Sequence, residues 1–234
     1  GGTPTPLAAA PNEFLTLAVA RLHARNLELQ RQVQHDALTG LRSRWALDQV
    51  LDVACGGQAG AMEPCAVVFV DIDHFSSYNK HHGDDQGDQA LRTVARTVLS
   101  SARCKDYVFR KGGEEMVVIL PGANRQEALG VAERIRSAVE RAAIPHAASP
   151  TARCITITVG VSASDDTEAK NLAELMHRAA GLAMRAKLAC RRNEVHAAAL
   201  GQCIPEPIDP ADAASSQSRL DGRPRDPALA SQLD

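Results

Sequence analysis

The first periodic stretch of the chain has an apolar residue or Asn at every third or fourth position. Read as heptads, it places Val or Asn at one seam position and Leu at the other, which is typical of a parallel two-stranded coiled coil. The alternative is an amphipathic helix that packs on its own domain, but the charged residues beside the seam suit burial poorly. We therefore predict flexible residues 1–11 and, over 12–35, a coiled-coil signalling helix that forms a homodimer. The seam positions are Asn12, Leu15, Val19, Leu22, Asn26, Leu29 and Val33.

The remaining apolar positions form short runs, which predict strands, and stretches of helical period, which predict helices. Segment 74–87 is polar and rich in turn-forming residues, and no period is visible over 199–234, which predicts a disordered tail. The order of elements predicts an α+β domain over 36–198, palm-like or ferredoxin-like, with a mixed central β-sheet flanked by helices. Strands are expected at 65–72, 107–109, 116–120 and 154–161, and helices at 44–54, 88–101, 124–142 and 172–188.

Composition narrows the class of protein. Of the 234 residues 44% are hydrophobic but only 3% are aromatic, so the core must be aliphatic. A net charge of -2 gives no electrostatic reason to expect nucleic acid as a partner. The six cysteines show no C-x-x-C pairing, which favours free thiols in a cytoplasmic, reducing compartment. No apolar run approaches the roughly 20 residues of a membrane span, so we expect no membrane contact in this piece. The opening Gly-Gly suggests the output part of a larger sensor protein.

Two adjacent glutamates, Glu114 and Glu115, follow a glycine pair between the strand-like runs 107–109 and 116–120. The glycines predict a tight β-hairpin turn, because glycine reaches positive φ without steric cost. A solvated hairpin tip is one interpretation of the two carboxylates, and a site for a metal ion and phosphate is the other. Asp71 ends the apolar run 65–72 and favours the second. Carboxylates from two segments that meet at a sheet edge, with water and substrate phosphate, are typical ligands of Mg²⁺.

Four further residues are candidates for nucleotide binding. Lys187 and Arg191 lie four residues apart at the end of a predicted helix, where they suit phosphate, or equally the negative end of the helix dipole. Asn79 and Asp88 offer an amide and a carboxylate, which match the donors and acceptor on the edge of guanine. As a turn residue and a helix-capping residue they are equally ordinary.

Together these motifs resemble the GGDEF diguanylate cyclase family over residues 36 to 193. The glycine–glutamate turn resembles the family signature in a GGEEM variant, and the other motifs follow in the family's order and spacing. Several matched motifs are more specific than any one of them. The matched segments are Asp36-Ala-Leu-Thr39, Asp71-Ile-Asp-His-Phe75, Asn79 with Asp88, Gly112-Gly-Glu-Glu-Met116, and Lys187 with Arg191.

The resemblance implies a diguanylate cyclase, which condenses two GTP into cyclic di-GMP and two pyrophosphates. Each domain of a homodimer holds one GTP, and the site is shared between the two domains. Asp71, Glu114 and the carbonyl group of Ile72 are implied to bind Mg²⁺ or Mn²⁺, with Glu115 in support. Metal ions in such a reaction polarise the phosphate, lower the pKa of the attacking hydroxyl and neutralise the leaving group.

The resemblance also implies how nucleotide and product bind. Asn79 and Asp88 would read guanine, and an inhibitory site for cyclic di-GMP of the form Arg-x-x-Asp would precede the hairpin. A plain surface ion pair is the alternative interpretation of that second motif. The implied phosphate-binding residues are Lys187, Arg191 and the backbone N–H groups around His74 and Phe75, and the implied inhibitory residues are Arg103, Asp106 and Arg134.

The chain departs from the family pattern at several positions around the nucleotide, and these keep an alternative open. Ser76, Lys80 and Asp84 replace the usual Lys, Asp and His, and one extra residue follows Cys190, so that either Arg191 or Arg192 fits the phosphate position. The alternative to an enzyme is a catalytically silent receptor that binds cyclic di-GMP and signals through its coiled coil. A purely structural dimerisation module is the third. The metal carboxylates and guanine-reading residues are retained, which favours the enzyme. Met116 and Met184 also depart, replacing Phe and Tyr.

Overall fold

The computed structural model describes residues 10–56, 64–165, 169 and 171–198. The predicted tail over 199–234 and most of the predicted flexible start therefore lie outside the described residues. Within α1 and the end of α2, the side chains of residues 10–14, 26–32 and 53–56 are likewise not described.

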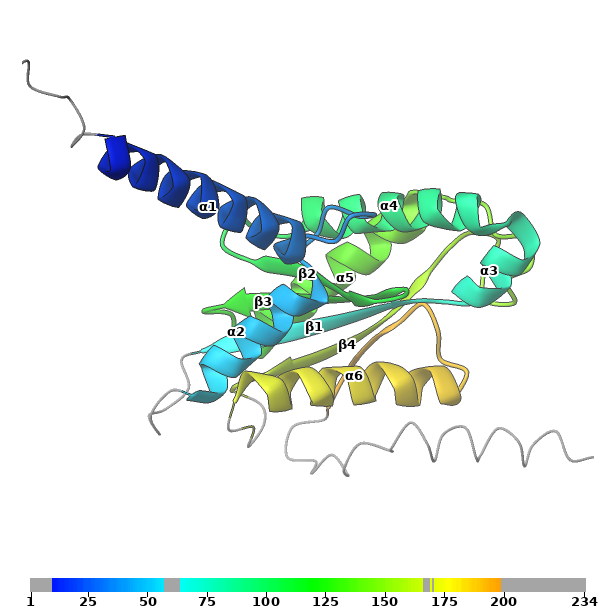
Figure 1. The fold of residues 1–234 in the computed structure, drawn as a ribbon. Coiled ribbons are helices and arrows are strands. Elements are labelled where there is room, and N and C mark those ends of the chain that lie inside the picture. Colours follow the sequence, from blue (N-terminus) through cyan, green and yellow to red (C-terminus); the bar gives the residue numbers. More distant parts are fainter. Residues whose placement is uncertain (1–9, 57–63, 166–168, 170, 199–234) are drawn as a thin grey trace, which may run out of the picture. The chain divides into compact units, whose positions relative to one another are not determined.

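A five-stranded mixed sheet organises the domain, with strand order β2-β3-β1-β4-β5 (Figure 1). Its central strand β1 pairs antiparallel with β3 on one side and with β4 on the other, whereas β4 and β5 run parallel. In the β1–β3 register Asp71 lies directly opposite Glu115, so both residues project to the same face. The strands are β1 Cys65–Ile72, β2 Tyr107–Gly112, β3 Glu115–Pro121, β4 Ile157–Ala163 and β5 Val195–Ala197.

Helices cover both faces of the sheet, and Figure 1 shows α4 and α5 on one side with α2 and α6 on the other. Because β1 is buried on both faces, its alternate residues enter two cores: Val68 and Val70 pack with α4 and α5, whereas Val67 and Phe69 pack with α2 and α6. The helices are α1 Ala10–Gln34, α2 Arg44–Gly56, α3 Phe75–His82, α4 Asp84–Ser101, α5 Arg125–Arg141 and α6 Leu172–Leu188.

The predicted α+β, palm-like class is confirmed, and the ends of β1 and α6 match the sequence prediction. The main error concerns 74–87, which we expected to be turns. This segment holds α3 and the first turn of α4. Helix α3 is eight residues long and mostly polar, so it shows too little apolar period to be recognised; only Phe75 and Tyr78 are buried. The three-residue β5 was not predicted, and β4 begins at Ile157 rather than at Cys154.

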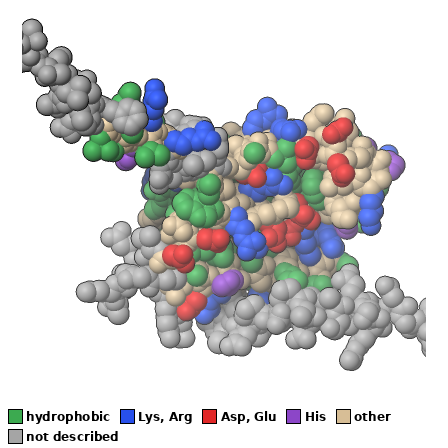
Figure 2. All heavy atoms as spheres, viewed as in Figure 1, with side chains coloured by type: hydrophobic (Ala, Val, Ile, Leu, Met, Phe, Trp, Pro, Cys, Tyr) green, Lys and Arg blue, Asp and Glu red, His purple; other side chains and the backbone are tan. Residues whose placement is uncertain are grey.

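Helix α1 presents apolar side chains to solvent. Leu15 is 61% exposed and Leu22 71% exposed, and Val19 and Val33 are exposed as well. Figure 2 shows hydrophobic side chains at the surface along this helix. These four described seam residues are not buried against their own domain, as the coiled-coil prediction requires. The seam positions Asn12, Asn26 and Leu29 lie among the undescribed side chains. In the described part of the chain, no helix has the length and hydropathy to cross a membrane.

Candidate active site

Two oxygen atoms at the end of β1 contact the same ammonium group. Lys187, near the end of α6, donates from Nζ to Asp71 Oδ1 at 2.5 Å and to the backbone carbonyl of Ile72 at 3.0 Å. These are two of the three predicted metal ligands, so the ammonium group marks a position where both of them face a cation. Oxygen donors of this kind suit Mg²⁺ or Mn²⁺. The predicted ligands at the end of β1 therefore fit a divalent ion, and Lys187 contacts two of these predicted ligands.

The carboxylates around Asp71 also favour a cation. The Asp71 side chain is only 19% exposed, and burial raises its pKa to about 6. Lys187 opposes this rise, whereas the charges of Glu114 and Glu115 add to it. Glu115 accepts a hydrogen bond from Lys111 Nζ at 2.7 Å, which suits a supporting role. No three His, Cys, Asp or Glu side chains within the described ranges already form a complete ligand set. Substrate phosphate and water would have to complete the coordination of Mg²⁺.

Asp73 is a buried acid to which the sequence assigned no role. Its side chain is fully buried and accepts hydrogen bonds from the hydroxyls of Thr156 at 2.8 Å and Thr158 at 2.6 Å. The backbone N–H of Asn193 donates to it as well, at 3.1 Å. Asp73 thereby joins the end of β1 to the loop after α6. Its position two residues after Asp71 was visible in the sequence, but its partners lie more than 80 residues away.

Arg110 supports the hairpin turn, and sequence reasoning missed this role. Its guanidinium donates from Nε and Nη2 to the carbonyl oxygen of Gly113, at 3.0 and 2.9 Å, and from Nη1 to both carboxylate oxygens of Asp36. Thr39 donates to Asp36 as well. Burial alone would raise the pKa of Asp36, but the hydrogen bonds from Thr39 and Arg110 lower it overall. Arg110 thus ties the segment after α1 to the residue that precedes Glu114.

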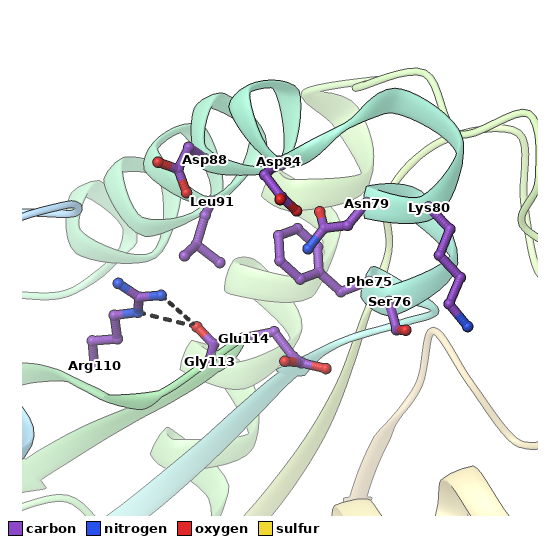
Figure 3. Close-up of a pocket in the computed structure, with 11 residues that line it drawn as sticks. Phe75, Ser76, Asn79, Lys80, Asp84, Asp88, Leu91, Arg110, Gly113 and Glu114 are labelled. Carbon is purple, nitrogen blue, oxygen red and sulfur yellow. Dashed lines mark hydrogen bonds between the residues drawn. The ribbon is translucent and has the colours of Figure 1, made fainter.

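A cavity of about 500 Å³ lies between α3, the start of α4 and the hairpin. Figure 3 shows the side chains of Asn79 and Asp88 on the helices above it and Glu114 below, so the predicted guanine-reading residues and the predicted metal ligand share one pocket. Asn79 Oδ1 is buried and has no hydrogen-bond partner among the described residues, so its acceptor capacity is unused in this part of the chain. The lining residues that depart from the family pattern are Ser76, Lys80 and Asp84.

Gly87 makes room for Asn79. A Cβ atom at Gly87 would lie 2.1 Å from Asn79 Oδ1 and 2.9 Å from its Cγ. No side-chain packing tolerates such distances, so the amide can hold this position only beside glycine. Gly87 therefore helps to shape the cavity that Asn79 and Asp88 line, although it has no side-chain polar atom.

The predicted phosphate-binding residues lie around the β1–α3 turn. His74 adopts the left-handed conformation, with φ 55° and ψ 29°, and caps α3 without a side-chain hydrogen bond. The first N–H groups of α3 are therefore free of a capping side chain, as an anion site at a helix N-terminus requires. Burial and the charge of Arg192 lower the pKa of His74.

The two candidate arginines after α6 have different surroundings. Arg191 is 63% exposed and donates two hydrogen bonds to Glu194 Oε2, at 2.7 and 3.1 Å. Arg192 Nε is buried and has no hydrogen-bond partner in the part of the chain described. Cys190, which stands at the usual glycine position, has φ 57°. The two arginines therefore differ: Arg191 is paired with Glu194, whereas Arg192 Nε is buried and unpaired among the described residues.

The predicted inhibitory residues gather at the end of α4. Arg103 and Asp106 form a closed turn, in which the Arg103 N–H donates to Asp106 Oδ2 at 2.7 Å and the Asp106 N–H donates to the Arg103 carbonyl at 3.0 Å. Arg134 on α5 donates to the carbonyl of Ser101 at 2.7 and 3.0 Å, two residues before this turn. The Asp106 carboxylate thus accepts a hydrogen bond from the backbone, and no ion pair of it is seen within the described residues. Both arginine side chains belong to exposed residues.

Comparison with known proteins identifies the family of the chain. The family model described as "Diguanylate cyclase, GGDEF domain" matches residues 33–193. The chain belongs to this family. The match begins at the end of α1 and ends in the loop after α6, so the GGDEF domain contains every site described above.

Curated relatives include diguanylate cyclase DgcM of Escherichia coli K12, which is 34% identical over 160 residues, covering 68% of this chain. Diguanylate cyclase DosC of the same strain is 37% identical over 114 residues, covering 48% of this chain. The chain spans only 37% of the length of DgcM and 24% of the length of DosC.

Solved structures with the same fold include the coiled coil and GGDEF domain of DgcB from Caulobacter crescentus in complex with c-di-GMP. It has a TM-score of 0.70 and 28% identity, covering 81% of this chain and 98% of that one. Diguanylate cyclase SiaD of Pseudomonas aeruginosa, in complex with its activator SiaC, has a TM-score of 0.61 and 28% identity, covering 80% of this chain and 71% of that one.

Proposed function

We propose that this GGDEF domain is a diguanylate cyclase that condenses two GTP into cyclic di-GMP and two pyrophosphates. One observation carries the proposal: a single cavity is lined by Asn79, Asp88 and Glu114. The predicted guanine-reading residues thus share a cavity with Glu114, one of the predicted metal ligands, and this supports the proposal. A base-reading pocket beside a cation-binding cluster is the arrangement that nucleotidyl transfer requires.

The proposed role of each site residue follows from the chemistry of its side chain or backbone groups. Asn79 and Asp88 hold the guanine edge, and the N–H groups of His74 and Phe75 meet phosphate oxygens. Asp71, Glu114 and the Ile72 carbonyl would hold Mg²⁺ or Mn²⁺, which supplies charge neutralisation on the phosphates and the leaving group. Glu115 holds a supporting position through Lys111. Lys187 Nζ lies between Asp71 and Ile72 and can turn from these oxygens to a phosphate, since its side chain has four rotatable bonds.

We assign the second phosphate-binding cation to Arg192 rather than to Arg191. Glu194 already neutralises Arg191, whereas Arg192 has a buried Nε without a partner among the described residues. The charge of Arg192 also contributes to lowering the pKa of His74, one of the predicted phosphate-binding residues. Arg192→Ala should raise the KM for GTP by about tenfold, since charge-assisted hydrogen bonds contribute about 1.5–3 kcal/mol. Arg191→Ala is the matched control and should change the KM by less than about twofold. The reverse pattern would return the role to Arg191.

The active unit is proposed to be a homodimer, because one pocket holds one GTP and the product joins two. The exposed Leu15, Val19, Leu22 and Val33 of α1 support a coiled coil that brings two domains together. The domains are thus assigned as a coiled-coil helix over 12–35 and a catalytic domain over 36–198. The free cysteines among the described residues, which include Cys65 and Cys154, support a cytoplasmic location.

Product inhibition is proposed at Arg103, Asp106 and Arg134. The Asp106-closed turn and Arg134 are both anchored around the end of α4, so the two exposed arginines lie on one part of the surface. Arginine is suited to this role because it can hold a phosphate, or the N7/O6 edge of guanine, with two hydrogen bonds.

The test is incubation with GTP and Mg²⁺, followed by measurement of pyrophosphate and of cyclic di-GMP by chromatography. The wild-type chain should form two pyrophosphates for each cyclic di-GMP, and Glu114→Gln should lose nearly all turnover because a metal ligand loses its charge. No product from a dimeric wild-type protein would refute the enzyme. In that case, binding of cyclic di-GMP would favour the silent receptor, and no binding of GTP or cyclic di-GMP would favour the dimerisation module.

A further inference from the structure

His146 is a buried histidine that belongs to none of the motifs above. It lies in the segment between α5 and β4, and its side chain is 0% exposed. Its backbone N–H is fixed by a 2.9 Å hydrogen bond to the Arg153 carbonyl, and its neighbour Pro145 pairs with Cys154. The histidine is thus carried on a closed loop that reaches from α5 to the β1–α3 turn.

The ring of His146 contacts the carbonyl oxygen of His74, with Nε2 at 3.2 Å. A carbonyl oxygen can only accept, so Nε2 must carry the hydrogen. Nδ1 is then a bare acceptor; it is buried and has no partner among the described residues. Burial lowers the pKa of His146, which is consistent with a neutral ring of this tautomer.

His74, the residue that His146 contacts, has a strained backbone conformation. His74 is one of few described non-glycine residues with positive φ, and its carbonyl also accepts the first helical hydrogen bond of α3, from the Tyr78 N–H at 3.0 Å. A left-handed conformation at a non-glycine residue costs about 1 kcal/mol and persists where neighbouring groups hold it. Thr151 provides a second contact from the same loop, to His74 Nε2 at 3.1 Å.

Aromatic packing orients the His146 ring. Tyr78 meets it edge to face, with centroids 5.1 Å apart, and Tyr78 in turn packs on His82 at 4.5 Å. The ring therefore has little freedom to rotate away from the His74 carbonyl. A leucine could fill much of this space, but it could not donate the hydrogen bond.

We propose that His146 is a positioning residue for the reaction: it holds the His74 turn so that the N–H groups of His74 and Phe75 face the GTP phosphates. The proposal rests on the proposed function, because it concerns the phosphate part of that site. His146 touches neither substrate nor metal in this role. It acts through the His74 carbonyl, from the side of the turn opposite to the free N–H groups of α3.

The test compares two ligands, a non-hydrolysable GTP analogue with an α,β-methylene bridge and guanosine, which lacks phosphates. His146→Leu should weaken binding of the analogue by about tenfold, as loss of a buried hydrogen bond to the turn predicts. Guanosine affinity should stay within about twofold, because the guanine pocket is untouched. His146→Gln keeps an amide N–H near the Nε2 position and should restore the affinity for the analogue to within about threefold of the wild type.

Val139→Ala is the matched control for stability, since Val139 is fully buried on α5 away from the pocket. It should lower Tm, as we also expect of His146→Leu, but it should change neither affinity. Equal losses for the analogue and guanosine in His146→Leu, or no loss for the analogue, would overturn the positioning role. If the wild type still made cyclic di-GMP, the proposed function would stand. Failure of the wild type to bind the analogue would overturn both.

A measurement that does not depend on turnover is the ¹⁵N spectrum of the histidine rings. His146 should show a neutral ring with hydrogen on Nε2, and its signal should disappear in His146→Gln, which assigns it. Hydrogen on Nδ1 instead would mean that the His74 carbonyl accepts nothing from this ring, and the proposal would fail on that result alone.

Discussion

Gly87→Ala should separate folding from the proposed guanine recognition in this domain. Gly87 lies inside α4, where alanine is the better helix former by about 0.5–1 kcal/mol. The added Cβ would, however, lie 2.1 Å from Asn79 Oδ1. An ordinary contact needs at least about 3.4 Å, so the amide must retreat by more than 1 Å. The atom that moves is the end of a flexible side chain that lines the cavity, and the backbone of α3 can stay in place.

The cost should therefore appear in binding rather than in stability. If the displaced Asn79 loses one or two hydrogen bonds to guanine, the loss is about 1–3 kcal/mol, or about 5- to 150-fold in affinity. Tm should stay level or rise slightly. The preference for GTP over ATP should fall along with the affinity, because the group that rejects adenine has moved.

The assay measures kcat/KM with GTP and with ATP by pyrophosphate release, beside thermal unfolding of the same preparations. Gly130→Ala on α5 is the matched control, since a Cβ there meets nothing within 4 Å. It should raise Tm modestly and leave the kinetics unchanged. If Gly87→Ala and Gly130→Ala had the same kcat/KM for GTP, Gly87 would have no part in the pocket, and the placement of Asn79 as a guanine reader would be refuted.

Three further predictions concern inhibition, assembly and pH. Arg103→Ala should raise the cyclic di-GMP concentration for half-inhibition at least tenfold and leave the initial rate unchanged; an unaltered inhibition curve would remove the regulatory assignment. Changing Leu15 and Leu22 to Lys should make specific activity rise steeply with protein concentration, and a tight dimer in sedimentation would contradict the coiled coil. With a chelator present, the raised pKa of Asp71, about 6 against an ordinary 3.8, favours the folded state at low pH, and this contribution is lost as pH rises through 6. Asp71→Asn should therefore raise the free energy of unfolding at pH 8 by about 3 kcal/mol, and no gain in urea titrations would refute the burial argument.

Much of the fold was predictable because the local signal is strong. The continuous apolar run of β1 and the helical period of α6 gave the correct ends of both elements. The metal carboxylates could be proposed for the same reason: Asp71 ends a buried strand, and Glu114 follows a glycine pair. Helix α3 escaped prediction because it packs through Phe75 and Tyr78 alone.

Contacts between distant segments could be seen only in the folded chain. Asp36 meets Arg110, Asp71 meets Lys187, and His146 meets the His74 carbonyl, with 72 to 116 residues between partners. Such pairs depend on strand order and on the crossing of helices over the sheet, which local periodicity does not record. The choice between Arg191 and Arg192 likewise depended on which guanidinium reaches Glu194. Residue types and their spacing thus indicated which chemistry the chain carries, whereas the packing of α6, the hairpin and the α5–β4 loop around β1 determined which atoms meet.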